Sequence, residues 1–243
     1  MKYAVELYLD WEHPPFVPSR KWIEDRIKLF HEFTLKSILN QTFQDFEIWM
    51  QCNPNYRDIT ENASWDERVY LIYDRAKSKL AELDDDYLVI TRMDTDDLFH
   101  KDALQDIKDN VITSDKRECL IFRQCIVWER VSGFIARWHR KSPPFHTHIF
   151  PKHVYQNFSE YERLHYISHS RAGGKLLQTK ELSSNKICVV EHSGNSTDSL
   201  GGKLRVKLDL EKVKNRSKGK FITCDHNEMV EILKDFGVRE QNV

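Results

Sequence analysis

Residues 87–99 read YLVITRMDTDDLF, and this stretch decides how the chain should fold. It begins as a run of strand-forming apolar residues and ends with three carboxylates, Asp94, Asp96 and Asp97, within four positions. Carboxylates this close repel each other and raise one another's pKa, so a positive partner is required. The stretch therefore predicts a strand that ends at a charged site.

Two simpler explanations of the acidic cluster are weaker. An aspartate that caps the next helix accounts for one acid and not for three. A calcium loop has glycine at its sixth position, where this chain has Phe99. A divalent cation, Mn²⁺ or Mg²⁺, held by carboxylate oxygens at the carboxyl end of a strand explains the cluster better, because open α/β sheets bind their ligands there.

The pattern around the cluster predicts an α/β fold. The first half alternates predicted strands, at residues 3–9, 46–52, 69–73 and 86–91, with predicted helices, at residues 20–40 and 100–112. Such alternation favours a mostly parallel central sheet flanked by helices. The second half predicts a hairpin at residues 119–130 and 133–140, a short helix within residues 157–165 near Ser159, a strand at 186–190 and a helix at 227–236.

Length and composition limit the function classes. We expect one domain over residues 1–243, with a first half (1–115), a second half (116–200) and a basic C-terminal extension with a short helix (201–243). Lys and Arg number 37 against 38 Asp and Glu, so no basic surface for nucleic acid is expected. Five scattered cysteines predict neither disulfides nor zinc. The absence of a signal peptide or long apolar run predicts a cytoplasmic chain without a transmembrane segment.

Further polar side chains accompany the predicted strand ends. Arg92 shares a strand face with Asp94, so it could donate to a phosphate or pair with Asp94. The other candidates follow the remaining strands: Asn53, Asp74, Arg75 and His192. Asn53, Asp74 and Arg75 could contact a base or ribose, although turn chemistry explains Asn53 almost as well. A lone histidine is more often structural, but His192 could complete a metal site. Together they predict a reaction in which a nucleoside diphosphate leaves.

These residues resemble the GT-A class of nucleotide-sugar glycosyltransferases, and FTLKSILNQTFQDFEIW resembles its inverting family 2 type. With WIEDRIKLFHEFTLKSILNQT, TRMDTDDLF and VVEHSGNS, the similarity is closest to a rhamnosyltransferase family over most of residues 1–200. The resemblance implies a GT-A fold and a UDP- or dTDP-sugar donor, with a nucleotide-sugar-binding half at residues 1–115 and an acceptor-side half at residues 116–200. By motif position it implies that the nucleotide base lies near Leu9, Asn53 and Arg75. Asp94 would lie toward the ribose and the metal, and Asp96 would be the main metal ligand. Asp97 would support the site or face the sugar, and His192 would contact the metal or the diphosphate.

The resemblance also implies an acidic general base that deprotonates the acceptor, a hydroxyl of a glycan or glycoconjugate. The family's Glu-Asp pair followed by Arg is absent from the middle of this chain. The candidates that remain are Glu160, Glu162, His165 and His169. Glu162 is the first choice because a carboxylate suits the family mechanism.

Two alternatives stay open. A sugar-phosphate nucleotidyltransferase normally has a glycine-rich, basic loop after its first strand, and residues 11–22, WEHPPFVPSRKW, contain no glycine. A non-catalytic nucleotide- or sugar-binding protein would not need Asp94, Asp96 and His192 to converge. If repulsion among the acids dominates, replacing Asp96 should not destabilise the fold.

Overall fold

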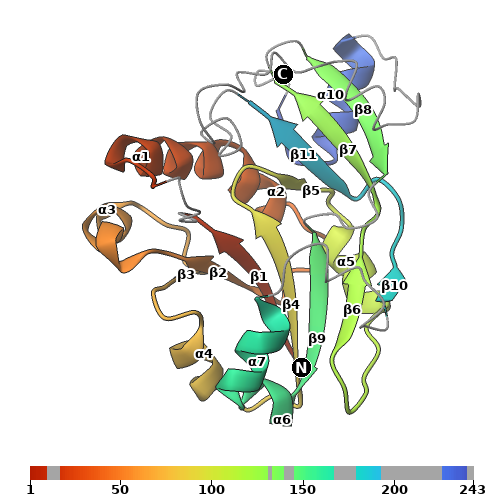
Figure 1. Cartoon of the computed structure of the whole chain (residues 1–243). Helices are drawn as coiled ribbons and strands as arrows, with labels where there is room; N and C mark the ends of the chain where they lie inside the picture. Colours follow the sequence, from red (N-terminus) through yellow and green to blue (C-terminus); the bar gives the residue numbers. More distant parts are fainter. Residues whose placement is uncertain (10–16, 131–132, 140–144, 167–178, 193–225, 240–243) are drawn as a thin grey trace.

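The computed structural model describes residues 1–9, 17–130, 133–139, 145–166, 179–192 and 226–239 (Figure 1). Two sheets form its centre. The seven-stranded sheet has the order β10-β6-β9-β4-β1-β2-β3, and the four-stranded sheet has the order β5-β11-β7-β8. The larger sheet is mostly parallel and flanked by helices, which confirms the expected α/β class.

The strands have the following bounds. The large sheet contains β1 (Lys2–Tyr8), β2 (Glu47–Gln51), β3 (Val69–Ile72), β4 (Tyr87–Asp94), β6 (Glu118–Ile121), β9 (His146–Pro151) and β10 (Thr179–Glu181). The small sheet contains β5 (Leu98–Phe99), β7 (Gln124–Glu129), β8 (Phe134–His139) and β11 (Ile187–Glu191). Only β9 runs against its neighbours in the large sheet, where it pairs with β4 and β6.

The helices connect and cover these strands. They are α1 (Arg20–Leu29), the π-helix η1 (Phe30–Thr34), α2 (Leu35–Leu39), the 3₁₀ helix η2 (Pro54–Tyr56), α3 (Arg57–Asn62), α4 (Lys77–Glu82), α5 (Ala103–Asp109), α6 (Lys152–Tyr155), α7 (Phe158–His165) and α10 (His226–Lys234). Ser19 is the N-cap of α1, and its side chain accepts from the Trp22 N–H at 3.1 Å. Within the described part of the chain, no helix is long and apolar enough to span a bilayer.

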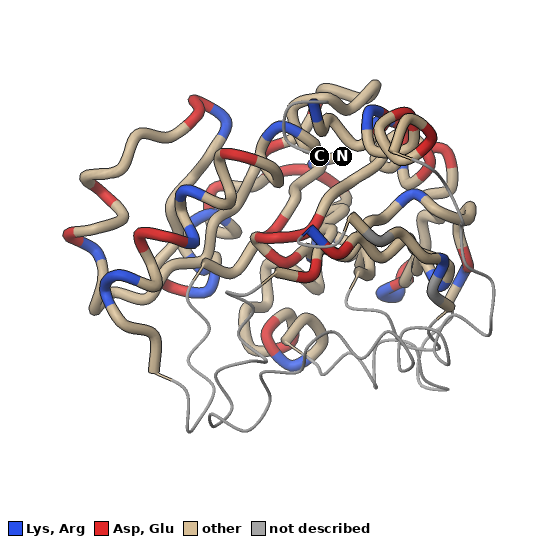
Figure 2. Tube along the Cα trace, turned by 90° about the horizontal axis from the view of Figure 1, so that it is seen from above, with Lys and Arg blue, Asp and Glu red and all other residues tan. Residues whose placement is uncertain are grey.

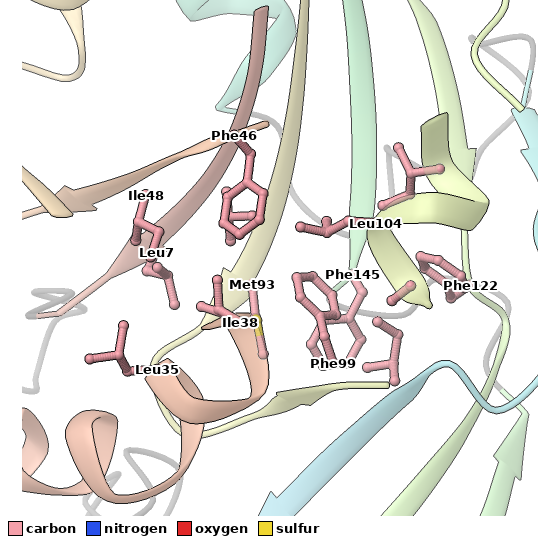
Figure 3. Packing of buried hydrophobic residues seen from close by; sticks show 14 of the residues in the cluster. Leu7, Leu35, Ile38, Phe46, Ile48, Met93, Phe99, Leu104, Phe122 and Phe145 are labelled. Carbon is pink, nitrogen blue, oxygen red and sulfur yellow. The ribbon is translucent and has the colours of Figure 1, made fainter. Parts of the chain in front are cut away.

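Three buried clusters hold the layers together. The largest packs α2 and α5 against one face of the large sheet, with Leu7, Ile38, Met93 and Phe99 near its middle (Figure 3). A second cluster fills the opposite face under α4, α6 and α7. A third lies between the small sheet and α10. Burial on both faces explains why the parallel strands are nearly continuous apolar runs.

Several details of the second half correct the sequence-based predictions. Residues 119–130 do not form one strand, because β6 and β7 belong to different sheets, although β7 and β8 do form the expected hairpin. Strand β9 was missed, since His146 and His148 occupy places where a buried strand usually has apolar residues. The short helix predicted within residues 157–165 is α7, and Asn157 is its N-cap. Most of the basic extension lies outside the described residues.

Candidate functional site

The acidic cluster lies where several elements meet. In Figure 1 the arrowheads of β1, β4 and β11 converge on the region beside α1. Parallel pairing of β1 and β4 brings Tyr8 level with Asp94 at the carboxyl edge. The turn after β4 is fixed from behind, because the Thr34 hydroxyl in η1 donates to the Thr95 carbonyl at 2.9 Å. The π-helix thus lies directly behind the candidate site, a place where such helices often occur.

Asp96 contacts two side chains from distant segments of the chain, Arg26 and His192. Its side chain is 11% exposed and forms an ion pair with Arg26 of α1. His192, which follows β11, places Nε2 at 3.1 Å from the same carboxylate oxygen, Oδ2. Burial raises the pKa of Asp96, but Arg26 and His192 outweigh burial and hold this pKa below its ordinary value. Asp96 is therefore ionised, and His192 Nε2 is the donor.

Asp97 has a different state from its neighbour. It is 3% exposed, and its Oδ1 accepts from the Val190 N–H at 2.9 Å. Burial, followed by the charges of Asp96 and Asp94, raises its pKa well above the ordinary value. Asp97 therefore fastens β11 to the turn after β4. The N-cap of α5 is Asp102, so Asp97 does not cap that helix.

Arg92 lies on the face of the sheet that carries Glu6 and Tyr8. Its guanidinium carbon is 4.7 Å from the centre of the Tyr8 ring, a cation–π contact. The β1–β4 register places Arg92 opposite Glu6. This arrangement holds a cation two residues from Asp94, as the sequence predicted, against an aromatic ring at the sheet edge.

Glu6 is the centre of a buried polar network on the same face. It is 0% exposed, and His165 of α7 lies with Nε2 at 2.5 Å from its Oε2. Gln51 and Tyr8 donate to its two oxygens at 2.8 and 2.9 Å. Burial raises the pKa of Glu6, but His165 and these hydrogen bonds together lower it below the ordinary value. The network joins β1, β2 and α7 beneath the candidate site.

Arg75 and Glu162 link the two halves of the chain. The Arg75 guanidinium is 2.6 Å from Glu162 Oε1. Arg75 and Ala76 both have left-handed backbone, with φ of 55° and 66°, which is uncommon for residues other than glycine. The Tyr166 hydroxyl donates to the Arg75 carbonyl at 3.0 Å and so supports this turn. Such strain is typical of functional positions, and it fixes Arg75 at the end of β3.

The other predicted site residues have these positions. Leu9 packs in the large core, while Asn53 accepts from Asn55 N–H and Asp74 accepts from Ser78 N–H, both at 2.9 Å. Glu160 lies in the first turn of α7, 3.8 Å from Arg163. His165 is 1% exposed against Glu6, so it cannot meet an acceptor in this arrangement. His169 lies outside the described residues.

Sequence reasoning missed Arg26, Glu6 and Tyr166. Arg26 carried a signal, because it lies among the apolar positions of α1, between Ile23 and Phe30. A charged residue on a buried helix face needs a buried partner. Glu6 carried a similar signal, as an acid inside an apolar strand. Its partner His165 lies 159 positions away and could not be found from local pattern.

The expected divalent cation can be compared with these side chains. Among the described residues, no three His, Cys, Asp or Glu side chains form a group that could hold a metal by themselves. Mg²⁺-type sites on nucleotides, however, need one or two carboxylates, with phosphate oxygens and waters completing the shell. Asp96 and His192 converge, with Asp94 in the same turn, so they fit a cation shared with a diphosphate. The cation itself stays a prediction.

Comparisons with known proteins give distant likenesses only. No family model and no curated protein matches this chain. Among solved structures, it is similar to the bifunctional IspDF of Campylobacter jejuni, with 12% identity, a TM-score of 0.42 and coverage of 82% of this chain but 53% of that one. It is also similar to 2-C-methyl-D-erythritol 4-phosphate cytidylyltransferase of Francisella tularensis, with 10% identity, a TM-score of 0.41 and coverage of 75% and 91%.

A third likeness is to the inositol-1-phosphate CTP transferase of T. maritima, with 13% identity, a TM-score of 0.38 and coverage of 81% of this chain and 93% of that one. The second and third of these neighbours are named as a cytidylyltransferase and a CTP transferase. Likenesses with such low identities and TM-scores do not show what this chain does. The similarity to a rhamnosyltransferase family therefore stays a prediction.

Proposed function

We propose that this chain is a glycosyltransferase that moves a sugar from a nucleoside-diphosphate sugar to an acceptor hydroxyl with inversion. The observation that carries the proposal is the meeting of Asp96, Arg26 and His192 at the carboxyl edge of a mostly parallel sheet. Ligands of open α/β sheets bind at this edge. Acids and cations fixed together there suit a ligand that has a ribose and a diphosphate.

The nucleotide would lie along the ends of β1 to β4. Asp94 could accept from the ribose hydroxyls, and Arg92 could donate to a phosphate. Asn53, Asp74 and Arg75 lie at the ends of β2 and β3, where a base such as uracil or thymine would reach. Leu9 could contribute only through its backbone or core packing, since its side chain is buried. The sugar is proposed as rhamnose from the family resemblance.

The chemistry is a single displacement. The acceptor hydroxyl gives its proton to a carboxylate, for which we propose Glu162, and its oxygen attacks the anomeric carbon. The bond from that carbon to the diphosphate oxygen breaks, and the electron pair leaves with the diphosphate. Arg26, Arg92 and His192 would stabilise the charge that develops on the leaving group. A divalent cation bound by Asp94, Asp96 and His192 would add to this stabilisation.

Arg75 would control Glu162 in this scheme. Its guanidinium holds the Glu162 carboxylate at 2.6 Å, on the side of α7 that approaches the end of β3. The pair is largely exposed, with Arg75 at 67% and Glu162 at 37%, so an incoming substrate can separate it at small cost. A donor phosphate or base bound by Arg75 would leave Glu162 available to an acceptor.

The nucleotidyltransferase alternative predicts different products, so mass spectrometry separates the two reactions. We expect UDP- or dTDP-sugars to yield the nucleoside diphosphate with Mn²⁺ present, and Asp96→Asn to lose this activity. Asp115→Asn, at an exposed loop position, is the matched control and should retain it. Formation of a nucleotide-sugar and pyrophosphate from a nucleoside triphosphate and a sugar phosphate would instead identify a nucleotidyltransferase. No turnover of either kind would favour a binding protein.

A further inference from the structure

Arg26 is a buried cation inside the candidate site. It projects from α1, is 7% exposed, and its guanidinium carbon lies 4.7 Å from the centre of the Trp22 ring. Its acidic partner, Asp96, is the residue to which the proposed function assigns the main metal contact. A buried guanidinium cannot exchange its partner for water without a large penalty. The ion pair is therefore a fixed feature of the ligand-free chain.

Arg26 and His192 contact the same atom, Oδ2 of Asp96. A carboxylate oxygen has two lone pairs, and two N–H groups from different elements approach this one. A divalent cation could bind Oδ2 only by displacing at least one of these donors. It would then lie beside the guanidinium, and like charges at such a distance repel strongly in a buried site.

We infer that Arg26 and a divalent cation compete for Asp96, and that a bound diphosphate ends this competition by pairing with the Arg26 guanidinium. The inference rests on the proposed function. It makes Arg26 a diphosphate-binding residue that also sets metal affinity. The planar donor fork of arginine suits both a carboxylate and a phosphate, so a phosphate can replace the carboxylate as the partner of its charge.

Coupled binding follows from this competition. The protein alone should hold a cation weakly, and the diphosphate should strengthen cation binding both by supplying oxygens and by removing the repulsion of Arg26. Reciprocity requires that the cation strengthen nucleotide binding by the same factor. A cation site without an internal competitor would gain only from the added oxygens.

The test is a titration of Mn²⁺, followed by electron paramagnetic resonance of the free ion, with and without UDP or dTDP. In the wild type we expect weak Mn²⁺ binding alone and at least about tenfold tighter binding with the nucleotide. In Arg26→Met, Mn²⁺ should bind about tenfold tighter than in the wild type without nucleotide, and the nucleotide should add much less.

Two further variants keep the result interpretable. Lys28→Met removes a charge from the exposed side of the same helix, where Lys28 is 75% exposed, and should leave both Mn²⁺ affinities unchanged. Arg26→Lys retains the buried charge and should retain the competition if Arg26→Met fails to fold.

Three results would overturn the inference. The first is equal Mn²⁺ affinity in the wild type with and without nucleotide, and the second is unchanged nucleotide-free affinity in Arg26→Met. Both leave the proposed function standing if UDP or dTDP binds. The third is a protein that binds neither nucleotide with or without Mn²⁺, which would overturn the proposed function as well.

Discussion

Two buried carboxylates near the ends of β1 and β4 have opposite surroundings. Glu6 is 0% exposed and is held by Gln51, Tyr8 and His165. Asp96 is 8% exposed, lies in a turn at the sheet edge, and is held at a single oxygen by an ion pair with Arg26 and a hydrogen bond with His192. Both are ionised, and in both the pKa is lowered despite burial.

The comparison separates a structural pair from an exchangeable one. The Glu6 network joins three elements inside the protein, and its carboxylate has a partner at each oxygen, so any exchange would open the core. The Asp96 pair lies at the carboxyl edge, in the turn that follows β4, where ligands of open α/β sheets bind. Acidic and basic residues are also interspersed along the described trace (Figure 2). The charges that would attract a ligand are therefore those of the site itself.

The largest effect is expected at the Glu6 pair. His165→Ala leaves an ionised carboxylate in the core with one partner lost, and removal of one partner from a buried pair costs about 3–5 kcal/mol. Urea unfolding followed by circular dichroism measures the free energy of unfolding. His153→Ala, at an exposed position of α6, should cost under about 0.5 kcal/mol. A loss of less than about 1 kcal/mol in His165→Ala would contradict a structural role for the pair.

A smaller loss is expected at Asp96, and here the structure corrects the sequence-based expectation. Relief of repulsion is not the main effect of replacing Asp96, because its charge is already matched by Arg26. Asp96→Asn should destabilise by about 1–3 kcal/mol, since the group that faces the guanidinium loses its charge but keeps an accepting oxygen. The same urea titration measures this loss. A cost equal to that of His165→Ala would remove the distinction between the two pairs.

The pH dependence of the free energy of unfolding tests His148, which packs against His165, the partner of Glu6. His148 faces His146, His165, Arg117 and Arg92, and burial, followed by these charges, lowers its pKa well below the ordinary value. The unfolded chain therefore takes up a proton on His148 below about pH 6.5, whereas the folded chain does not. Stability should fall as pH drops from 7 to 5, and His148→Gln should flatten this fall. Urea midpoints at each pH test it, and an unchanged slope would contradict a neutral buried His148.

The smallest effect on stability is expected at the exposed Arg75–Glu162 pair. Glu162→Gln should change the free energy of unfolding by under about 1 kcal/mol, because exposed ion pairs contribute little. Its effect on sugar transfer should be large, about 10²- to 10⁴-fold, if Glu162 is the general base. Donor binding should be preserved, as isothermal calorimetry can show. Normal turnover would move the role to Glu160 or His169.

Local pattern in the sequence was enough for the first half of the fold. The strand before Asp94 and the helix after Ser19 were found because apolar spacing and capping are local signals. Strand β9 was not found, because His148 is buried against His165 of α7, a contact that only the fold creates. The split between β6 and β7 also depends on pairing with distant strands.

The candidate site was predicted in the same uneven way. Asp96 and His192 were expected to converge, and they do. Arg26 was not expected, because the helix was predicted from the spacing of its apolar residues. That criterion takes no account of a charged residue among them. The sequence thus predicted that the acids need a cation, and the fold supplies one from within the chain. Whether Arg26 or a metal ion pairs with a ligand is decided only when the ligand binds, and no local signal in the sequence could predict it.

The most direct test of the central claim is calorimetric titration of UDP and dTDP into the wild-type chain, Asp94→Asn and Asp115→Asn, each with Mn²⁺. We predict binding of a nucleoside diphosphate at one site, at least about tenfold weaker in Asp94→Asn and unchanged in Asp115→Asn. Absence of binding in the wild type, or equal affinity in wild type and Asp94→Asn, would contradict a nucleotide-sugar site at the carboxyl edge of this sheet.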